Sequence, residues 1–239
     1  MPLPRLPRRD FGVELETQSG THPTLTTHEG FIAKSDCSIS GLEFVSPVLR
    51  GRRGLRRLRR FMRDGRGVMQ INRHCGFHAH FDMRSVDLND QQRFAVAAAY
   101  MATETQWFAK VTRSRQDNNY CHHWDERYLM EYLEGAMYRD NFYDRARLQD
   151  RYHWLNVRAF VDHGSFENRL HQGTWNFTKV KNWIVLNLRF IRAASKLRCT
   201  RPASNQMSVE EFKEKAALCL QWAESGERLR ALNQMATTI

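Results

Sequence analysis

Acidic and basic side chains recur two residues apart in three short segments of this 239-residue chain. The segments are Gly12-Val13-Glu14-Leu15-Glu16, Gly76-Phe77-His78-Ala79-His80 and Phe166-Glu167-Asn168-Arg169. Residues i and i+2 of a β-strand point to the same face. Neighbouring strands could therefore direct carboxylates, imidazoles and a guanidinium into one space, where divalent metal and nucleotide phosphate are common ligands. The pattern predicts a metal-dependent enzyme.

Each acidic candidate also has a structural explanation. Glu14 and Glu16 share a predicted strand face, and an isolated pair of this kind is usually solvated. Glu43 interrupts the apolar run Leu42–Val45. If it is buried there, it requires a metal or a salt bridge to an arginine.

The second half of the chain supplies one further pair. Glu167 and Arg169 either form an ordinary ion pair or place a metal ligand beside a guanidinium that grips phosphate. The second arrangement suits phosphoryl transfer. The sequence has no GxxxxGK[ST], no GxGxxG after a strand and no GxSxG, so P-loop, Rossmann and serine-hydrolase sites are not indicated.

The histidines leave two metal chemistries open. His78 and His80 could both reach a metal or a phosphate, or could be two hydrogen-bonded histidines in a sheet. With Cys75 they could instead form the zinc site of a hydrolase, and Cys121-His122-His123 adds further zinc-type ligands. Carboxylates outnumber thiolates in the apparent cluster, which favours magnesium or manganese.

The segment Arg50–Arg66 contains nine arginines. Leu55, Leu58 and Met62 recur there at helical spacing, so the segment is predicted to be an amphipathic helix with a basic face. The whole chain has 37 Lys and Arg against 26 acids, a formal net charge of +11. The helix either binds nucleic-acid phosphates or is a solvated surface that covers the sheet.

The five cysteines are scattered and form no CxxC pair, which indicates a reducing, cytoplasmic compartment. Residues 1–9 are basic and proline-rich but lack the apolar core of a signal peptide. No apolar run approaches the roughly 18–20 residues that a membrane span needs. No membrane partner is expected.

Hydrophobic periodicity predicts an alternation of strands and helices. Strands are expected at 11–17, 31–39, 42–46, 68–83, 153–160 and 165–171, with turns at 40–41 and 162–164. Helices are expected at 50–66, 89–108, 125–137, 140–149, 178–194 and 208–223, and a loop at 114–119. The helices do not follow a regular βαβ spacing. We therefore expect an α+β fold with a mostly antiparallel sheet covered by helices.

Taken in order, five short motifs resemble the amidoligase family, part of the glutamine synthetase and glutamate–cysteine ligase superfamily. They are FGVELE at 11–16, DCSI at 36–39 with GLEFVSP at 41–47, CGFHAH at 75–80, RYHWLN at 151–156 and FENR at 166–169 followed by Gly173-Thr174. Each motif is short, but the five occur in the same order over about residues 10 to 190.

The resemblance implies an ATP-dependent ligase that joins a carboxylate to an amine through an acyl-phosphate. Its implied ligands for two or more Mg²⁺ (or Mn²⁺) ions are Glu14, Glu16, Glu43, His78 and Glu167. His80 would contact the ATP phosphates, and Arg169 beside Glu167 would steady the transferred phosphoryl group. The implied fold is a curved antiparallel sheet like the glutamine synthetase catalytic domain.

The implied organisation is a basic tail at 1–9, a catalytic domain at 10–195 and a helical extension at 196–239. The sequence leaves open the adenine pocket and whether the chain forms an oligomer. Further candidate contacts to substrate or nucleotide are Arg73, Asn156, Arg158, His171 and Lys179. The substrates are a carboxylate and an amine on a small molecule or a peptide, or an amino acid or polyamine joined to modified DNA. A basic nucleic-acid-binding protein without catalysis is the competing interpretation.

Overall fold

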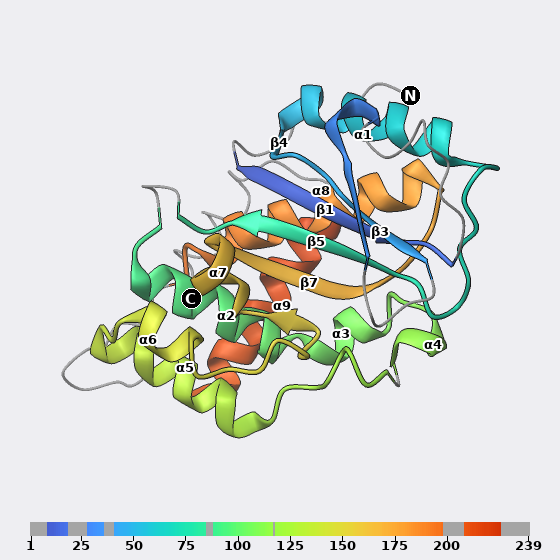
Figure 1. Cartoon of the computed structure of the whole chain (residues 1–239). Helices are drawn as coiled ribbons and strands as arrows, with labels where there is room; N and C mark the ends of the chain where they lie inside the picture. The colour runs from blue at the N-terminus through green and yellow to red at the C-terminus, as the bar shows by residue number, and fades with distance from the viewer. Residues whose placement is uncertain are drawn as a thin grey trace.

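The computed structural model describes residues 9–18, 28–35, 41–84, 88–116, 118–197 and 208–225. Within these ranges seven strands form one sheet (Figure 1). They are β1 (Asp10–Glu16), β2 (Ile32–Ser35), β3 (Leu42–Val45), β4 (Leu49–Arg50), β5 (Gly76–Asp82), β6 (Leu155–Asn156) and β7 (Ser165–Gln172). Their order is β2-β3-β1-β5-β7-β6, with β4 also paired to β1, and every strand pair is antiparallel.

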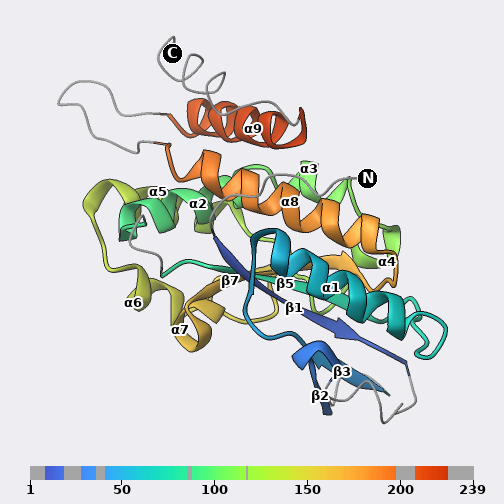
Figure 2. The same ribbon diagram turned by 90° about the horizontal axis from the view of Figure 1, so that it is seen from above.

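The helices cover one face of this sheet and one end of it. They are η2 (His28–Gly30), α1 (Gly51–Gly65), α2 (Asp90–Ala102), α3 (Glu104–Phe108), α4 (Arg113–Gln116), α5 (Glu126–Tyr138), α6 (Phe142–Ala146), α7 (Ala159–His163), α8 (Phe177–Ala194) and α9 (Val209–Ser225). Figure 2 shows α1 and α8 side by side above the strands, with α9 packed outside α8. The predicted α+β class and the mostly antiparallel sheet are confirmed.

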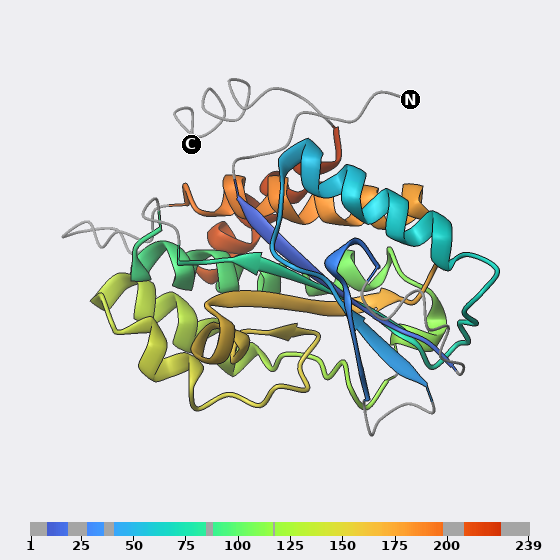
Figure 3. The same ribbon diagram turned by 45° about the horizontal axis from the view of Figure 1, so that its top comes forward.

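The sheet has one apolar and one polar face because its strands alternate. Phe11, Val13 and Leu15 of β1 are buried on the helical side, as are Phe77 and Phe81 of β5. The residues between them point to the opposite face, which α1 and α8 leave uncovered (Figure 3). The polar face therefore carries the candidate site, and the apolar face carries the core.

Local sequence signals explain where several helices begin. The Asn89 side chain accepts the backbone N–H of Gln92, whose side chain accepts the N–H of Asn89, so a capping box begins α2 at the residue expected to start this helix. Ser208 accepts the N–H of Glu211 at the start of α9, within the segment predicted to be a helical extension. From α9, Phe212 joins the same core as α8.

Five predicted elements differ in extent from those in the structure. The long helix expected at 89–108 breaks at Thr103, whose hydroxyl donates to the carbonyl of Ala99 and accepts the indole N–H of Trp107. The strand at 68–83 begins only at Gly76. The expected loop at 114–119 contains part of α4, and the expected helix at 140–149 shortens to α6.

The strand expected at 153–160 is also shorter, because β6 has two residues and then turns into α7. The side chain of Asn156 accepts the N–H of Ala159 at 3.2 Å, which ends the strand. Gly164, with φ 67°, closes α7 in the left-handed conformation that glycine adopts readily. Ser40 of the expected 40–41 turn and the 36–39 motif lie outside the described residues. Among the residues placed, no helix is long and apolar enough to cross a membrane.

Candidate functional site

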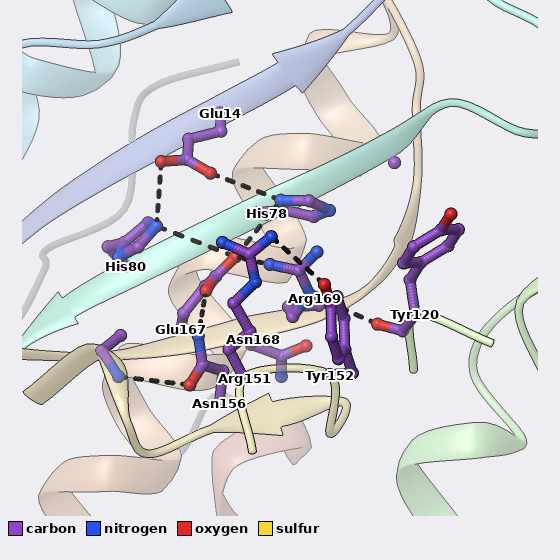
Figure 4. Close-up of polar contacts among 12 residues, drawn as sticks. Glu14, His78, His80, Tyr120, Arg151, Tyr152, Asn156, Glu167, Asn168 and Arg169 are labelled. Atoms are coloured by element: carbon purple, nitrogen blue, oxygen red, sulfur yellow. Dashed lines mark hydrogen bonds and ion pairs between the residues drawn. The ribbon is translucent and has the colours of Figure 1, made fainter. Parts of the chain in front are cut away.

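The antiparallel register sets the predicted site residues opposite one another across five strands. The facing residues are Glu43 and Glu16, Glu14 and His78, His80 and Glu167, and Glu167 and Asn156. Figure 4 shows the side chains of Glu14, His78, His80 and Glu167 pointing toward one another on the polar face. Residues far apart in the sequence thus meet because each occupies the same face of its own strand.

Glu14 lies at the centre of this group. One of its carboxylate oxygens, Oε2, lies 3.4 Å from Nδ1 of His78, and the other, Oε1, lies 3.3 Å from Nε2 of His80. Burial raises the pKa of Glu14, but its close contacts with the two imidazoles outweigh burial and hold the pKa well below its usual value. The side chain keeps 21% of its exposure, so a ligand can reach this carboxylate.

His78 is surrounded by acids. Its Nδ1 also lies 3.2 Å from Glu167 Oε1, and its Nε2 lies 3.4 Å from Glu16 Oε1. Burial and the charge of Arg169 lower the pKa of His78. Hydrogen bonds to Glu14 and Glu167 have the opposite effect and prevail, raising the pKa to about 9. In the metal-free protein this imidazole is therefore protonated at neutral pH.

Glu167 has a different set of partners on each oxygen. Oε1 accepts a hydrogen bond from Nη1 of Arg169 at 2.7 Å, and Oε2 accepts one from Nδ2 of Asn156 at 2.6 Å. Burial raises the pKa of Glu167, but the Arg169 charge and the histidines lower it to about 2. The carboxylate is thus ionised at every physiological pH.

His80 has the geometry of a metal-ligating imidazole. Its Nδ1 lies 3.0 Å from Ser165 Oγ, whereas its buried Nε2 faces Glu14 and makes no hydrogen bond within the described part of the chain. Metal-ligating histidines commonly hydrogen-bond through one ring nitrogen and bind the ion through the other. His80 was expected to contact phosphate, and its position makes metal ligation an equal candidate.

Two triads of side chains could each hold a metal ion, and they share Glu14. One triad is Glu14, Glu43 and His78, and the other is Glu14, His80 and Glu167. In each triad one donor atom per residue lies within 4.8 Å of the others. Three carboxylates with two imidazoles suit Mg²⁺ or Mn²⁺ better than the softer metals. The residues present therefore fit a pair of divalent cations.

Glu16 has a more structural role than the other acids. Its carboxylate is 6% exposed and accepts the backbone N–H of Gly76 at 2.5 Å. It belongs to neither triad, although it contacts His78. Glu16 is therefore placed to hold His78 in position, which differs from the ligand role that the resemblance implied.

A β-bulge in β7 sets which way the side chains after Asn168 point. Asn168 pairs with Ala79 and His171 pairs with Phe77, so two residues of β7 face the single intervening residue of β5. The extra residue reverses the alternation. His171, a candidate substrate contact from the sequence, consequently packs against Phe77 and Trp183 on the helical side.

The bulge is held by partners that the sequence did not indicate. The Asn168 side chain accepts the N–H of Leu170 at 3.1 Å and donates to Asn187 of α8 at 2.9 Å. Tyr100 of α2 donates to the same Asn187 oxygen at 2.8 Å. The only sequence signal was a polar residue, Asn187, on the apolar stripe of a helix. This network fixes the backbone that positions Arg169.

The backbone of Arg169 has three partners, Trp154, Arg115 and Cys121. Its N–H donates to the carbonyl of Trp154, and its carbonyl accepts a hydrogen bond from Nη2 of Arg115 at 2.7 Å. Arg115 is 2% exposed and also donates to Cys121 Sγ at 3.0 Å. Arg115 lies in the segment expected to be a polar loop, so sequence reasoning missed it.

The rim beside Arg169 carries aromatic rings and another guanidinium. Arg169 Nε donates to the carbonyl of Tyr120 at 3.3 Å, and Arg151 donates to the Tyr152 hydroxyl at 3.3 Å. The Tyr152 ring packs against the Tyr120 ring with centroids 5.9 Å apart, and Figure 4 shows the contact between Arg151 and Tyr152. Arg151 is the first residue of the 151–156 motif, but no local pattern assigns it a role of its own.

The remaining candidates fall into two groups. Asn156 lies within the site through Glu167. Arg158 donates to the carbonyl of Arg147, and Arg73 and Lys179 are exposed. The zinc interpretation required the thiol of Cys75 as a ligand. Cys75 Sγ instead contacts Asn72, and neither triad among the described residues contains a cysteine.

The sequence was also compared with known proteins and protein families. Residues 22–191, more than two thirds of the chain, match the model of a family described as "putative amidoligase enzyme". Glu43, His78, Glu167 and Arg169 fall inside this match, and Glu14 precedes it. Searches of curated proteins and of solved structures found no match. The chain therefore belongs to the amidoligase family, whose description is that of ligase enzymes.

Proposed function

We propose that this protein is an ATP- and Mg²⁺-dependent ligase that joins a carboxylate to an amine through an acyl-phosphate. The observation that supports it most directly is the pair of acid–imidazole triads sharing Glu14. A family whose name describes amide-bond ligation agrees with it. The substrates would be a small-molecule or peptide carboxylate and an amine.

Five residues would hold the divalent cations: Glu14, Glu43, His78, His80 and Glu167. When bound, such ions neutralise the charge of a nucleotide triphosphate. Because His78 is protonated in the metal-free protein, it must release its proton before its ring nitrogen can act as a ligand.

Arg169 would bind the phosphoryl group during transfer. Glu167 and the carbonyl of Tyr120 hold its Nη1 and Nε, so the guanidinium is fixed while 16% of the side chain stays exposed. A guanidinium fixed in this way can donate to phosphoryl oxygens without reorganising as charge develops. Glu167 is thus a positioning residue for Arg169 as well as a candidate ligand.

The chemistry then has two balanced steps. The substrate carboxylate attacks the γ-phosphorus of ATP, and the bond to the β-phosphate oxygen breaks to release ADP. The amine attacks the acyl carbon, phosphate leaves with the bonding electrons, and the amine loses a proton.

The test is ADP release on a mixed pool of carboxylates and amines with Mg²⁺. The wild type should release ADP over many turnovers only when both substrate classes are present. Glu167→Gln should lose this activity, and the exposed Glu210→Gln on α9 should retain it. ADP release by Glu167→Gln at the wild-type rate would contradict the proposal, as would release that no carboxylate stimulates.

A further inference from the structure

The basic helix α1 takes no part in the site described above. Its apolar side packs into the core, where Phe61 stacks on Phe31 with ring centroids 3.8 Å apart. Its arginines point outward, and most of them are exposed. Figures 2 and 3 place the helix beside α8 on one face of the sheet. Glu14 and His78 alternate along their strands with the residues buried on that face, so they belong to the opposite one. The arginine face is therefore a separate surface.

A cavity of about 630 Å³ lies against this helix. It is lined by four guanidiniums and one carboxylate, from Arg53, Arg56, Arg57, Arg60 and Glu29. Such a lining has an excess of positive charge, which favours an anionic ligand.

The four arginines differ in how they are held. Glu29 fixes two of them: Arg60 donates to both of its carboxylate oxygens, one at 2.8 Å, and Arg57 donates to its backbone carbonyl. Arg53 and Arg56 are exposed and have no acidic partner among the residues that the structure places. The surface thus combines two anchored guanidiniums with two that are available to bind.

We propose that this face of α1 binds the phosphate backbone of duplex nucleic acid without reading its sequence. Guanidinium forks match phosphate oxygens in pairs. The helix has 15 residues, a length of about 22 Å. At 3.4 Å of axis per phosphate this is roughly six phosphates of one strand. Apart from Asp64, its exposed polar side chains are all arginines.

Other anionic partners fit this face less well. A membrane-surface helix needs an apolar face to insert among lipids, and the apolar face of α1 is buried in the core. Single-stranded nucleic acid is usually held by stacking on exposed aromatic rings. The only ring within α1, Phe61, is fully buried. Duplex phosphate therefore fits best, and this inference does not depend on the ligase proposal.

The experiment is fluorescence anisotropy of a labelled 20-base-pair duplex of random sequence, titrated with the full chain at several salt concentrations. The double variant Arg53→Ala/Arg56→Ala should bind at least tenfold more weakly. Its slope of log affinity against log salt should be smaller than the wild-type slope by about 2, one counterion for each lost phosphate contact. Arg53→Lys/Arg56→Lys, which keeps the charge, should retain most of the binding.

The matched control is Arg127→Ala/Arg147→Ala, which removes the same charge from exposed positions in α5 and after α6. It should bind within about twofold of the wild type, because the effect belongs to α1 and not to net charge. Thermal melting of each variant confirms folding. The proposal is overturned if the wild type does not bind the duplex at 50 mM salt, or if both double variants weaken binding equally. Tighter binding to single strands, polyglutamate or anionic vesicles would also overturn it.

Discussion

His78 and His171 are both buried in the same sheet, yet they lie in opposite environments. His78, 3% exposed, contacts Glu14 and Glu167, and these hydrogen bonds raise its pKa to about 9. His171, 6% exposed, packs against Trp183, and burial lowers its pKa to about 4. One imidazole is a charged member of a polar cluster, and the other is a neutral core residue.

The difference shows that the face of the strand, and not the residue type, decides what a buried histidine does here. His171 follows Arg169 by two residues and would point into the site in a regular strand. The bulge between Asn168 and His171 turns it to the core instead. Charge is thereby confined to one side of the sheet and apolar packing to the other. Substitutions on the two faces should consequently differ in their effects on activity and on stability.

The largest effect should follow from Glu14→Gln, because both triads use this carboxylate. We expect ADP release to fall by about 10²- to 10³-fold, the range found when a group that stabilises transition-state charge is removed. His171→Phe, on the opposite face, should keep activity within a few-fold. Steady-state kinetics on both variants measures the contrast, and equal losses would show that the two faces are not functionally separate.

On the core face, Asn187→Ala should lower the free energy of unfolding by about 3–5 kcal/mol, because it leaves the buried groups of Tyr100 and Asn168 unpaired. Asn141→Ala is the matched control, because it removes only the cap of α6 and should cost about 1 kcal/mol. Urea unfolding gives both values. A loss at Asn187 no larger than at Asn141 would mean that the network does not hold the bulge.

In the metal-free protein, the two histidines should have opposite effects on how the free energy of unfolding depends on pH. The pKa of His171 in the folded state is lowered to about 4. Its contribution to the free energy of unfolding is therefore lost as pH falls from about 6.5 toward 4, and this loss is on the order of 3 kcal/mol. The folded-state pKa of His78 is raised to about 9, so its contribution is present below pH 6.5 and lost as pH rises through 9.

Urea unfolding at pH 5, 7 and 9 checks this difference. His171→Phe should flatten the acid side of the stability profile, and His78→Gln should flatten the alkaline side. The same change in both profiles would contradict the assignment of the two imidazoles to different environments.

The smallest effect concerns a glycine beside the cluster. A Cβ at Gly76 would lie 2.7 Å from His78 Nε2 and 3.2 Å from Glu16 Oε2, so Gly76→Ala should displace that imidazole. We expect stability to fall by about 1–3 kcal/mol and Mn²⁺ affinity to fall severalfold. Gly12→Ala on the same face meets His80 Cβ only at 3.7 Å and should change little. Indistinguishable variants would indicate that the site tolerates displacement of His78.

Period-two spacing was enough to predict which acids and histidines share a face, because a strand carries that information in its own residues. Glu14, His78 and Glu167 meet as expected, and the predicted family membership is confirmed. The bulge could not be predicted, since it depends on Asn187 and Tyr100, which lie on distant helices. The same limit explains why the strand pattern left His171 among the candidate contacts to substrate or nucleotide.

Non-local contacts also account for the misplaced elements. Residues 153–160 were expected to form one strand, but the side chain of Asn156 both ends β6 and binds Glu167. Arg115 looked like part of a polar loop, although it is buried against the carbonyl of Arg169. The contacts with Glu167 and Arg169 do not appear in the local pattern, because these partners lie 11 and 54 residues away from Asn156 and Arg115.

The central claim is that the polar face of the sheet binds divalent cations through Glu14. The most direct test is Mn²⁺ binding followed by electron paramagnetic resonance, with and without a non-hydrolysable ATP analogue and with Mg²⁺ as competitor. We predict that the wild type binds Mn²⁺, that Mg²⁺ displaces it, and that Glu14→Gln abolishes binding while His171→Phe retains it. No binding by the wild type in the presence of nucleotide, or undiminished binding by Glu14→Gln, would contradict the account.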